Sequence, residues 1–178
     1  ARRSSVPLSW VPPIISSPSL GWVARPWNWV AEKSSMLRLV QLDPASSEMA
    51  NETVQAETYF TKDDDPDGLS QDWFGKVWLN PPYGKGTGLF TTKLIHEFDA
   101  GHVEAAILLI NAYGFDSAWF QPLWNHVLCF TDHRIVFYSP QRESGGPANG
   151  NLLVYLGPSP ERFLEVFHRF GAVVKTWG

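Results

Sequence analysis

The segment Val77–Gly84 joins an apolar run to a polar residue, two prolines and an aromatic ring. Its first three residues are typical of a buried strand, because branched and aromatic side chains pack well on a pleated surface. The two prolines after Asn80 remove two backbone donors and end the strand. We therefore expect the Asn80 amide, the Pro81 carbonyl and the Tyr83 ring to lie together at the carboxyl end of a strand, where open α/β sheets bind ligands.

This cluster suits methylation of an exocyclic amine, a poor nucleophile because its lone pair is delocalised into an aromatic ring. The Asn80 side-chain oxygen and the Pro81 carbonyl can accept hydrogen bonds from the two N–H groups and aim the lone pair at an electrophilic methyl group. The Tyr83 ring can stack on a base flipped out of a duplex. Asn80, Pro81, Pro82 and Tyr83 are therefore the candidate catalytic residues. Alternatively they form an ordinary turn, because Asn-Pro and Pro-Pro pairs are common in turns.

Composition narrows the possible classes of protein. The 178 residues are enough for one domain with a real core, and 44% are hydrophobic. The formal net charge of −4 argues against nucleic-acid binding by bulk charge, although a local basic groove would suffice for DNA. The single cysteine, Cys129, excludes an intrachain disulfide and a cysteine-rich zinc site, and we expect it to be a buried small hydrophobe. The histidines show no metal-ligand spacing, so no metal is expected, and no apolar run is long enough to cross a membrane.

The chain divides into an irregular basic segment, residues 1–38, and a regular domain, residues 39–178. The first segment is rich in Ser, Pro and Trp and has no helical or strand period. It is either an aromatic, basic arm that grips nucleic acid or a poorly ordered leader, and the lack of periodicity favours the leader.

Strands and helices alternate through the second part of the chain. The expected strands are 36–42, 58–61, 76–79, 103–111, 127–130, 134–138, 152–156 and 172–174, and the expected helices are 48–56, 90–100, 117–124 and 160–170. Ser46 or Ser47 is expected to cap the first helix. Strands 134–138 and 152–156 are expected to pair across the intervening loop. This order predicts a doubly wound α/β sheet, mostly parallel, with a terminal antiparallel pair.

Acidic residues follow two of the early strands. Asp43 comes at the end of a predicted strand, where a carboxylate can bind a ribose hydroxyl or an amino group, or can simply face solvent in a loop. The run from Asp63 to Asp67 can contact a positively charged cofactor, although such a run is more often a solvated turn. The segment Gly84–Gly88 does not fit the phosphate-loop pattern and is interpreted as a mobile loop in which Lys85 meets DNA backbone.

An ordered set of short matches makes the chain similar to the DNA N6-adenine methyltransferases of phages and prophages, the Dam-like family. The main matches are Leu42–Ser46, Tyr59–Thr61, Asp67–Trp73 and Gly75–Gly84, followed by smaller ones at 93–94, 111–112, 119–120, 129–130, 134–135 with Phe137, and 155–157 with Phe163 and Phe167. Together they cover about residues 39 to 175, which is most of the chain.

The resemblance implies a Rossmann-like class I methyltransferase fold and S-adenosyl-L-methionine as the cofactor. It implies that Asn80, Pro81, Pro82 and Tyr83 form the catalytic loop. Residues of the turn after the first strand (Asp43, Pro44 and Ala45), together with Asp67, would bind the cofactor. Arg134 lies where such enzymes carry an arginine in a late strand, and either a DNA phosphate or a structural ion pair would suit it.

The implied partner is double-stranded DNA with a flipped adenine, acted on by a monomer in the cytoplasm of a bacterial host cell. Two alternatives remain. One is a methyltransferase acting on a protein glutamine or an RNA guanine amine, because those enzymes share the Asn-Pro-Pro-Tyr motif. The other is a decayed, inactive homologue that only binds nucleic acid, which the irregular first segment would suit.

Overall fold

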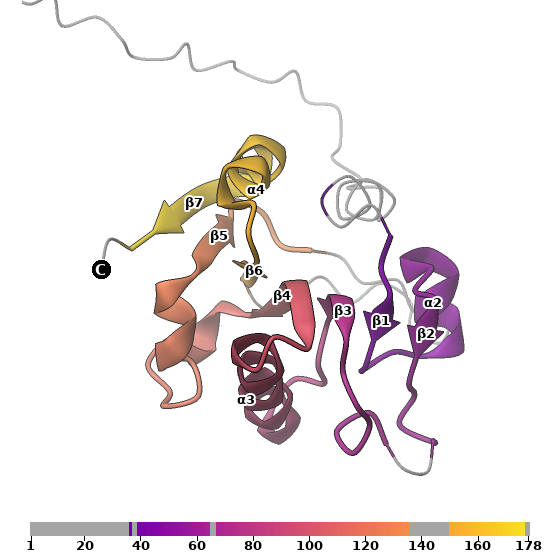
Figure 1. Ribbon diagram of the computed structural model, residues 1–178. Coiled ribbons are helices and arrows are strands. Elements are labelled where there is room, and N and C mark those ends of the chain that lie inside the picture. Colours follow the sequence, from indigo (N-terminus) through magenta and orange to yellow (C-terminus); the bar gives the residue numbers. More distant parts are fainter. Residues whose placement is uncertain (1–35, 37–38, 65–66, 136–149, 177–178) are drawn as a thin grey trace, which may run out of the picture.

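The computed structural model describes residues 36, 39–64, 67–135 and 150–176, which form one mixed sheet with helices on both faces (Figure 1). The strands are β1 (Leu42–Asp43), β2 (Thr58–Tyr59), β3 (Gly75–Leu79), β4 (Val103–Asn111), β5 (Val127–Thr131), β6 (Asn151–Leu156) and β7 (Gly171–Lys175). The helices are α2 (Glu48–Val54), α3 (Lys85–Asp99) and α4 (Pro160–Phe167), and the short 3-10 helices are η1 (Ala112–Gly114), η2 (Gln121–Asn125) and η3 (His168–Phe170).

The strands of the described residues lie in the order β2-β1-β3-β4-β6-β5-β7. Strands β2, β1, β3 and β4 are parallel, whereas β6 is antiparallel to both β4 and β5, and β7 is antiparallel to β5. The prediction of an α/β sheet with a parallel part and an antiparallel end is therefore confirmed. The finer assignment to a Rossmann-like methyltransferase sheet stays a prediction.

The predicted partner of strand 152–156 is wrong. Strand β6 lies between β4 and β5, with Leu153 opposite Leu109 on one side and Cys129 on the other. Both edges of β6 are thus occupied by buried apolar strands, and no edge is left for the segment that begins at Arg134. Arg134 and Ile135 lie outside any strand, and residues 136–138 fall outside the described residues.

The core has two layers, one on each face of the sheet. Alternate residues of β4 divide between them, because successive side chains of a strand point to opposite faces. Ile107 belongs to the layer covered by α4, with Phe163 and Phe167, whereas Leu108 belongs to the layer covered by α3, with Leu94. Figure 1 shows α3 and α4 on opposite sides of the strands. Burial on both faces explains why β4 is one continuous apolar run.

Helix α3 begins five residues earlier than the predicted start at residue 90, so the interpretation of Gly84–Gly88 as a mobile loop is wrong. Gly84 adopts φ of 103°, and its carbonyl accepts a hydrogen bond from the Thr87 amide. Glycine is costly inside a helix, but a Cβ on Gly88 would lie 2.9 Å from Trp119 Cδ1. Close packing against this ring offsets the poor helix propensity, and Lys85 becomes the first residue of a helix.

Other boundaries differ by smaller amounts. Met36 is helical, so the predicted strand 36–42 is wrong at its start, although the Gln41 amide already donates to the Lys76 carbonyl. Ser47 caps α2 by accepting from the Ala50 amide at 3.1 Å, as predicted. The predicted helix 117–124 is only partly helical, as η2.

The basic segment 1–38 lies outside the described residues except for Met36. None of the helices in the described ranges has the length and apolar content that a membrane crossing requires.

Candidate active site

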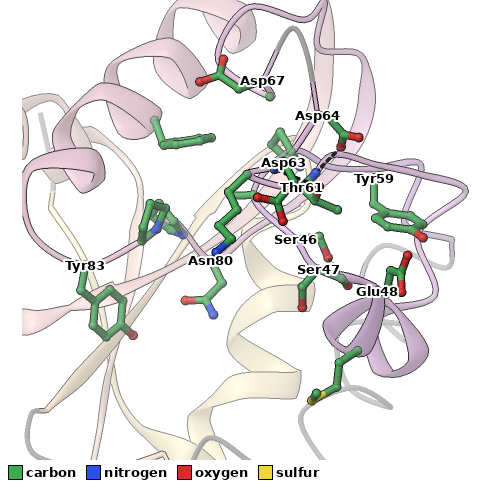
Figure 2. A pocket seen from close by; sticks show the side chains of 18 residues that line it. Ser46, Ser47, Glu48, Tyr59, Thr61, Asp63, Asp64, Asp67, Asn80 and Tyr83 are labelled. Carbon is green, nitrogen blue, oxygen red and sulfur yellow. Dashed lines mark hydrogen bonds between the residues drawn. The ribbon is translucent and has the colours of Figure 1, made fainter. Parts of the chain in front are cut away.

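A pocket of about 1350 Å³ opens at the carboxyl edge of the parallel strands (Figure 2). Residues that follow β1, β2 and β3 line it, among them Ser46, Thr61 and Asn80. Because these strands are parallel, their carboxyl ends lie at one edge of the sheet, and their loops meet there. The volume exceeds the roughly 300 to 1,000 Å³ of a pocket for one small ligand, so the site has room for a cofactor and part of a second substrate.

The turn after β1 forms one wall of the pocket. The Asp43 carboxylate is 2% exposed and accepts a hydrogen bond from the Ala45 amide at 3.3 Å. The Ser46 amide donates to the Phe60 carbonyl, and the Phe60 amide donates to the Asp43 carbonyl. These bonds fix the turn against the end of β2. The alternative that Asp43 is a solvent-facing loop acid is therefore wrong.

Gly68 brings the loop before β3 onto the same turn. A Cβ at this position would lie only 1.9 Å from the Pro44 carbonyl oxygen, so only glycine permits this approach. The Gly68 carbonyl accepts a hydrogen bond of 2.7 Å from Nε1 of Trp73, whose side chain is 1% exposed. The Trp73 ring stacks on Phe90 with a centroid distance of 6.1 Å. The buried Trp73 thus holds Gly68 against Pro44. Gly68 and Pro44 both line the pocket.

The loop after β3 forms the opposite wall. Pro81 is buried, and the Pro82 carbonyl accepts a hydrogen bond from the Thr87 hydroxyl at 3.0 Å, which ties the turn to the first turn of α3. Asn80 lies between Tyr83 and the side of the pocket that carries Asp63, as Figure 2 shows. Two prolines and the bond from α3 restrict the backbone of the loop that carries Asn80.

The Asn80 Oδ1 atom is buried and has no hydrogen-bond partner among the described residues. Buried polar groups are nearly always paired, and leaving one unpaired costs about 1 to 3 kcal/mol. Asn80 also lines the pocket. An unpaired acceptor in a pocket wall is a place for a ligand that donates a hydrogen bond.

The Tyr83 ring is anchored at its hydroxyl end, although the residue is 42% exposed. Its phenol oxygen lies 3.2 Å from Nδ2 of Asn151, the first residue of β6. Partial burial raises the pKa of the Tyr83 phenol, and the hydrogen bond from Asn151 opposes that increase. The phenol is therefore neutral at physiological pH.

Carboxylates dominate the charge of the pocket. Glu48, Asp63, Asp64 and Asp67 line it, and Lys62 is the cation among the lining residues. Figure 2 shows Asp63, Asp64 and Asp67 on the loop between β2 and β3. Several carboxylates around one pocket favour a ligand with positive charge. The acidic run 63–67 is thus both exposed and part of the pocket wall, with residues 65 and 66 outside the described residues.

The structure brings together most of the residues predicted from the sequence. The predicted residues that line the pocket are Pro44, Ala45, Asp67, Asn80, Pro81, Pro82 and Tyr83. Asp43 is buried and is not among the lining residues, so its direct contact with a cofactor stays a prediction. Lys85 and Arg134 are exposed and also lie outside the lining, and their contacts with DNA stay predictions. No group of three metal-ligating side chains occurs in the part of the chain that the structure describes.

Sequence reasoning missed two residues that support the site. Trp73 lies in the segment that leads into the strand of the catalytic turn and within the match Asp67–Trp73, but its contact with Gly68 cannot be seen in the sequence. Asn151 gave one weak signal, a polar residue placed directly before the apolar run of β6. Its partner Tyr83 is 68 positions away in the chain, so no local pattern connects the two residues.

These features define an α/β protein whose ligand pocket lies at the carboxyl edge of a mixed sheet, with an Asn-Pro-Pro-Tyr turn in its wall. A family model described as DNA N-6-adenine-methyltransferase (Dam) matches residues 23–165. The match covers most of the chain, and the protein belongs to this family. No curated protein matches it in sequence.

Proposed function

We propose that this protein transfers the methyl group of S-adenosylmethionine to the exocyclic N6 amine of adenine in double-stranded DNA. Membership of the DNA N-6-adenine-methyltransferase family supports the substrate and the reaction. The observation that carries the proposal for this chain is the buried, unpaired Oδ1 atom of Asn80 in the pocket wall. An amine N–H group would supply the missing hydrogen-bond donor.

The cofactor fits the acidic side of the pocket. S-adenosylmethionine carries a positively charged sulfonium and an ammonium group, and when bound it supplies an electrophilic methyl group. The carboxylates of Asp63, Asp64 and Asp67 give this side the complementary charge. The turn at Pro44 and Ala45 would hold the cofactor against the end of β1.

The chain's own residues would act mainly by positioning. Asn80 Oδ1 and the Pro81 carbonyl accept hydrogen bonds from the amine, which draws the nitrogen toward a tetrahedral shape and aims its lone pair. Tyr83 stacks on the flipped base. The buried Pro81 and the bond from Thr87 to Pro82 keep these acceptors in place, so little reorganisation is needed when the base arrives.

On the DNA side, we assign phosphate contacts to Lys85 and Arg134. Both are exposed: Lys85 lies directly after the catalytic turn, and Arg134 lies beyond the end of β5. Such contacts would hold the duplex in register without reading its sequence. We expect a monomer to act on DNA in the cytoplasm of a bacterial host cell.

The direct test is transfer of labelled methyl from S-adenosylmethionine to unmethylated DNA, with RNA and protein offered in parallel. Asn80→Ala is expected to lower the rate at least about 100-fold, as loss of a well-placed catalytic group does. It should not lower the free energy of unfolding by loss of a hydrogen bond, because Oδ1 has no partner among the described residues to lose.

Asn125→Ala is the matched control, because Asn125 is exposed in η2, before the amino end of β5 and away from the catalytic edge. The control should keep the wild-type rate. Wild-type protein that methylates no DNA, or an Asn80→Ala variant as active as wild type, would contradict the proposal. Faster transfer to RNA or protein than to DNA would assign another substrate.

A further inference from the structure

The amide of Asn151 connects the catalytic turn to the antiparallel half of the sheet. Its Nδ2 atom lies 3.2 Å from the Tyr83 phenol oxygen, and its Oδ1 atom lies 3.0 Å from the amide nitrogen of Ile135. The residue is 3% exposed. These two contacts join parts of the chain that are distant in sequence, the loop after β3 and the segment after β5.

The orientation of this amide follows from its partners. The Ile135 backbone N–H can only donate, so the side-chain atom that faces it must be the oxygen. The NH₂ group must then face the Tyr83 oxygen and donate to it. Because both ends of the amide are used and the residue is buried, the side chain cannot rotate without breaking a hydrogen bond.

The backbone of Asn151 is fixed as well. It is paired with Asn111 at the carboxyl end of β4, and its carbonyl accepts a hydrogen bond from the Thr131 hydroxyl at 3.1 Å. Because β6 is antiparallel to β4 and β5, its first residue lies at the same edge as the carboxyl ends of those strands. The tyrosine ring is thus anchored to the first residue of a strand that is paired on both sides.

We propose that Asn151 is a positioning residue, which holds the Tyr83 ring in the orientation needed to stack on the flipped base. This inference rests on the proposed function, because it concerns binding of the base by the same site. The bond fixes the hydroxyl end of a ring that is 42% exposed, so less conformational entropy is left for the ring to lose on stacking. Asn151 would therefore affect DNA binding more than the methyl-transfer step.

The first test is a double-mutant cycle with Tyr83→Phe, Asn151→Ala and the double variant, measured as KM for unmethylated DNA. Each single change is expected to raise this KM about 3- to 10-fold, the usual effect of one hydrogen bond, with kcat and the KM for S-adenosylmethionine nearly unchanged. The double variant should be no worse than Asn151→Ala alone, because the shared bond can be lost only once. The inference would be overturned if the increase in KM in the double variant equalled the product of the two single increases, or if Tyr83→Phe left the KM unchanged.

Asn51→Ala is the matched structural control. The Asn51 amide is also bonded at both ends, with Oδ1 accepting from the Ala56 amide and Nδ2 donating to the Ala56 carbonyl, but it lies in the middle of α2 and does not line the pocket. Loss of these bonds should lower stability without changing the KM for DNA. If Asn151→Ala does not fold, the KM of Tyr83→Phe for DNA is the test. This variant is expected to fold, because it removes only the hydroxyl of an exposed residue.

A second readout needs no methyl transfer. The Tyr83 phenol can be titrated by NMR of ring-labelled tyrosine, with Tyr83→Phe used to assign the signal. The bond from Asn151 lowers the pKa of Tyr83, so Asn151→Ala should raise it. An unchanged pKa of Tyr83 in Asn151→Ala would contradict the proposed hydrogen bond between the two residues. A raised pKa, in a protein that methylates no DNA, would support this hydrogen bond and contradict the proposed function.

Discussion

The contact between Gly68 and Pro44 gives a prediction whose size can be worked from the structure. In Gly68→Ala the new Cβ would lie 1.9 Å from the Pro44 carbonyl oxygen, and 3.0 Å is the closest such approach that real Cβ atoms make. The two backbones must therefore separate by at least the difference, about 1.1 Å. Neither side moves freely, because Trp73 holds the Gly68 carbonyl and the end of β2 holds the turn.

Two consequences are expected. Overpacking of this kind costs about 1 to 3 kcal/mol of the free energy of unfolding. A domain of this size has about 5 to 15 kcal/mol in total, so the variant should still fold and can be assayed. Because Pro44 and Gly68 both line the pocket, its wall shifts by about 1 Å, and misplacement on that scale can lower a rate about 100-fold.

The assay combines urea unfolding, titration with S-adenosylmethionine by calorimetry, and methyl transfer to DNA. Gly150→Ala is the control, because among the described residues a Cβ there would meet only Ala112 Cβ at 3.9 Å, an ordinary contact. The control should change none of the three measurements. If Gly68→Ala unfolds at the wild-type urea concentration and transfers methyl at the wild-type rate, the two loops do not approach as described, and the reasoning fails.

Two further predictions concern titratable groups away from the pocket. Burial raises the pKa of the Cys129 thiol to about 12, and the Asp132 charge adds to the shift. The native protein should therefore not react with a thiol reagent at pH 8, whereas the protein in denaturant should react once per chain. Prompt reaction of the native protein would contradict this burial. Hydrogen bonds from His102 and Lys93 lower the pKa of Glu97 below its ordinary 4.5. These bonds therefore contribute to stability above pH 4.5, and the contribution is lost as the pH falls through the lowered pKa of Glu97 in the folded protein. Glu97→Gln should reduce the loss of stability below pH 4.5 in urea unfolding, and a pH dependence identical to wild type would show that the pairing contributes nothing.

The local chemistry of the catalytic turn could be predicted from the sequence. Asn80 must end the strand, because the two prolines after it cannot donate to a neighbouring strand. The continuous apolar run of β4 was equally clear, because it is set by a few consecutive residues. These features depend on chain stiffness and side-chain polarity, which are local properties.

Features that depend on competition between distant segments could not be predicted in this way. The predicted partner of β6 was segment 134–138, whereas the fold places β6 between β4 and β5 because each buries apolar residues against it. The start of α3 was missed because its glycines look like a loop until Trp119 packs against Gly88. In both cases the favoured local structure was overridden by packing.

The class of fold, the turn with its four candidate catalytic residues, and the resemblance that the family match bears out all follow from the order of amino acids along the chain. The support of that turn comes from the three-dimensional packing. This packing placed an unpaired Asn80 oxygen in a pocket wall, brought Gly68 onto Pro44, and set Asn151 against a tyrosine 68 positions away. The physical reason is that hydrogen bonding and steric approach depend on distance in space, and a chain pattern records only distance along the backbone.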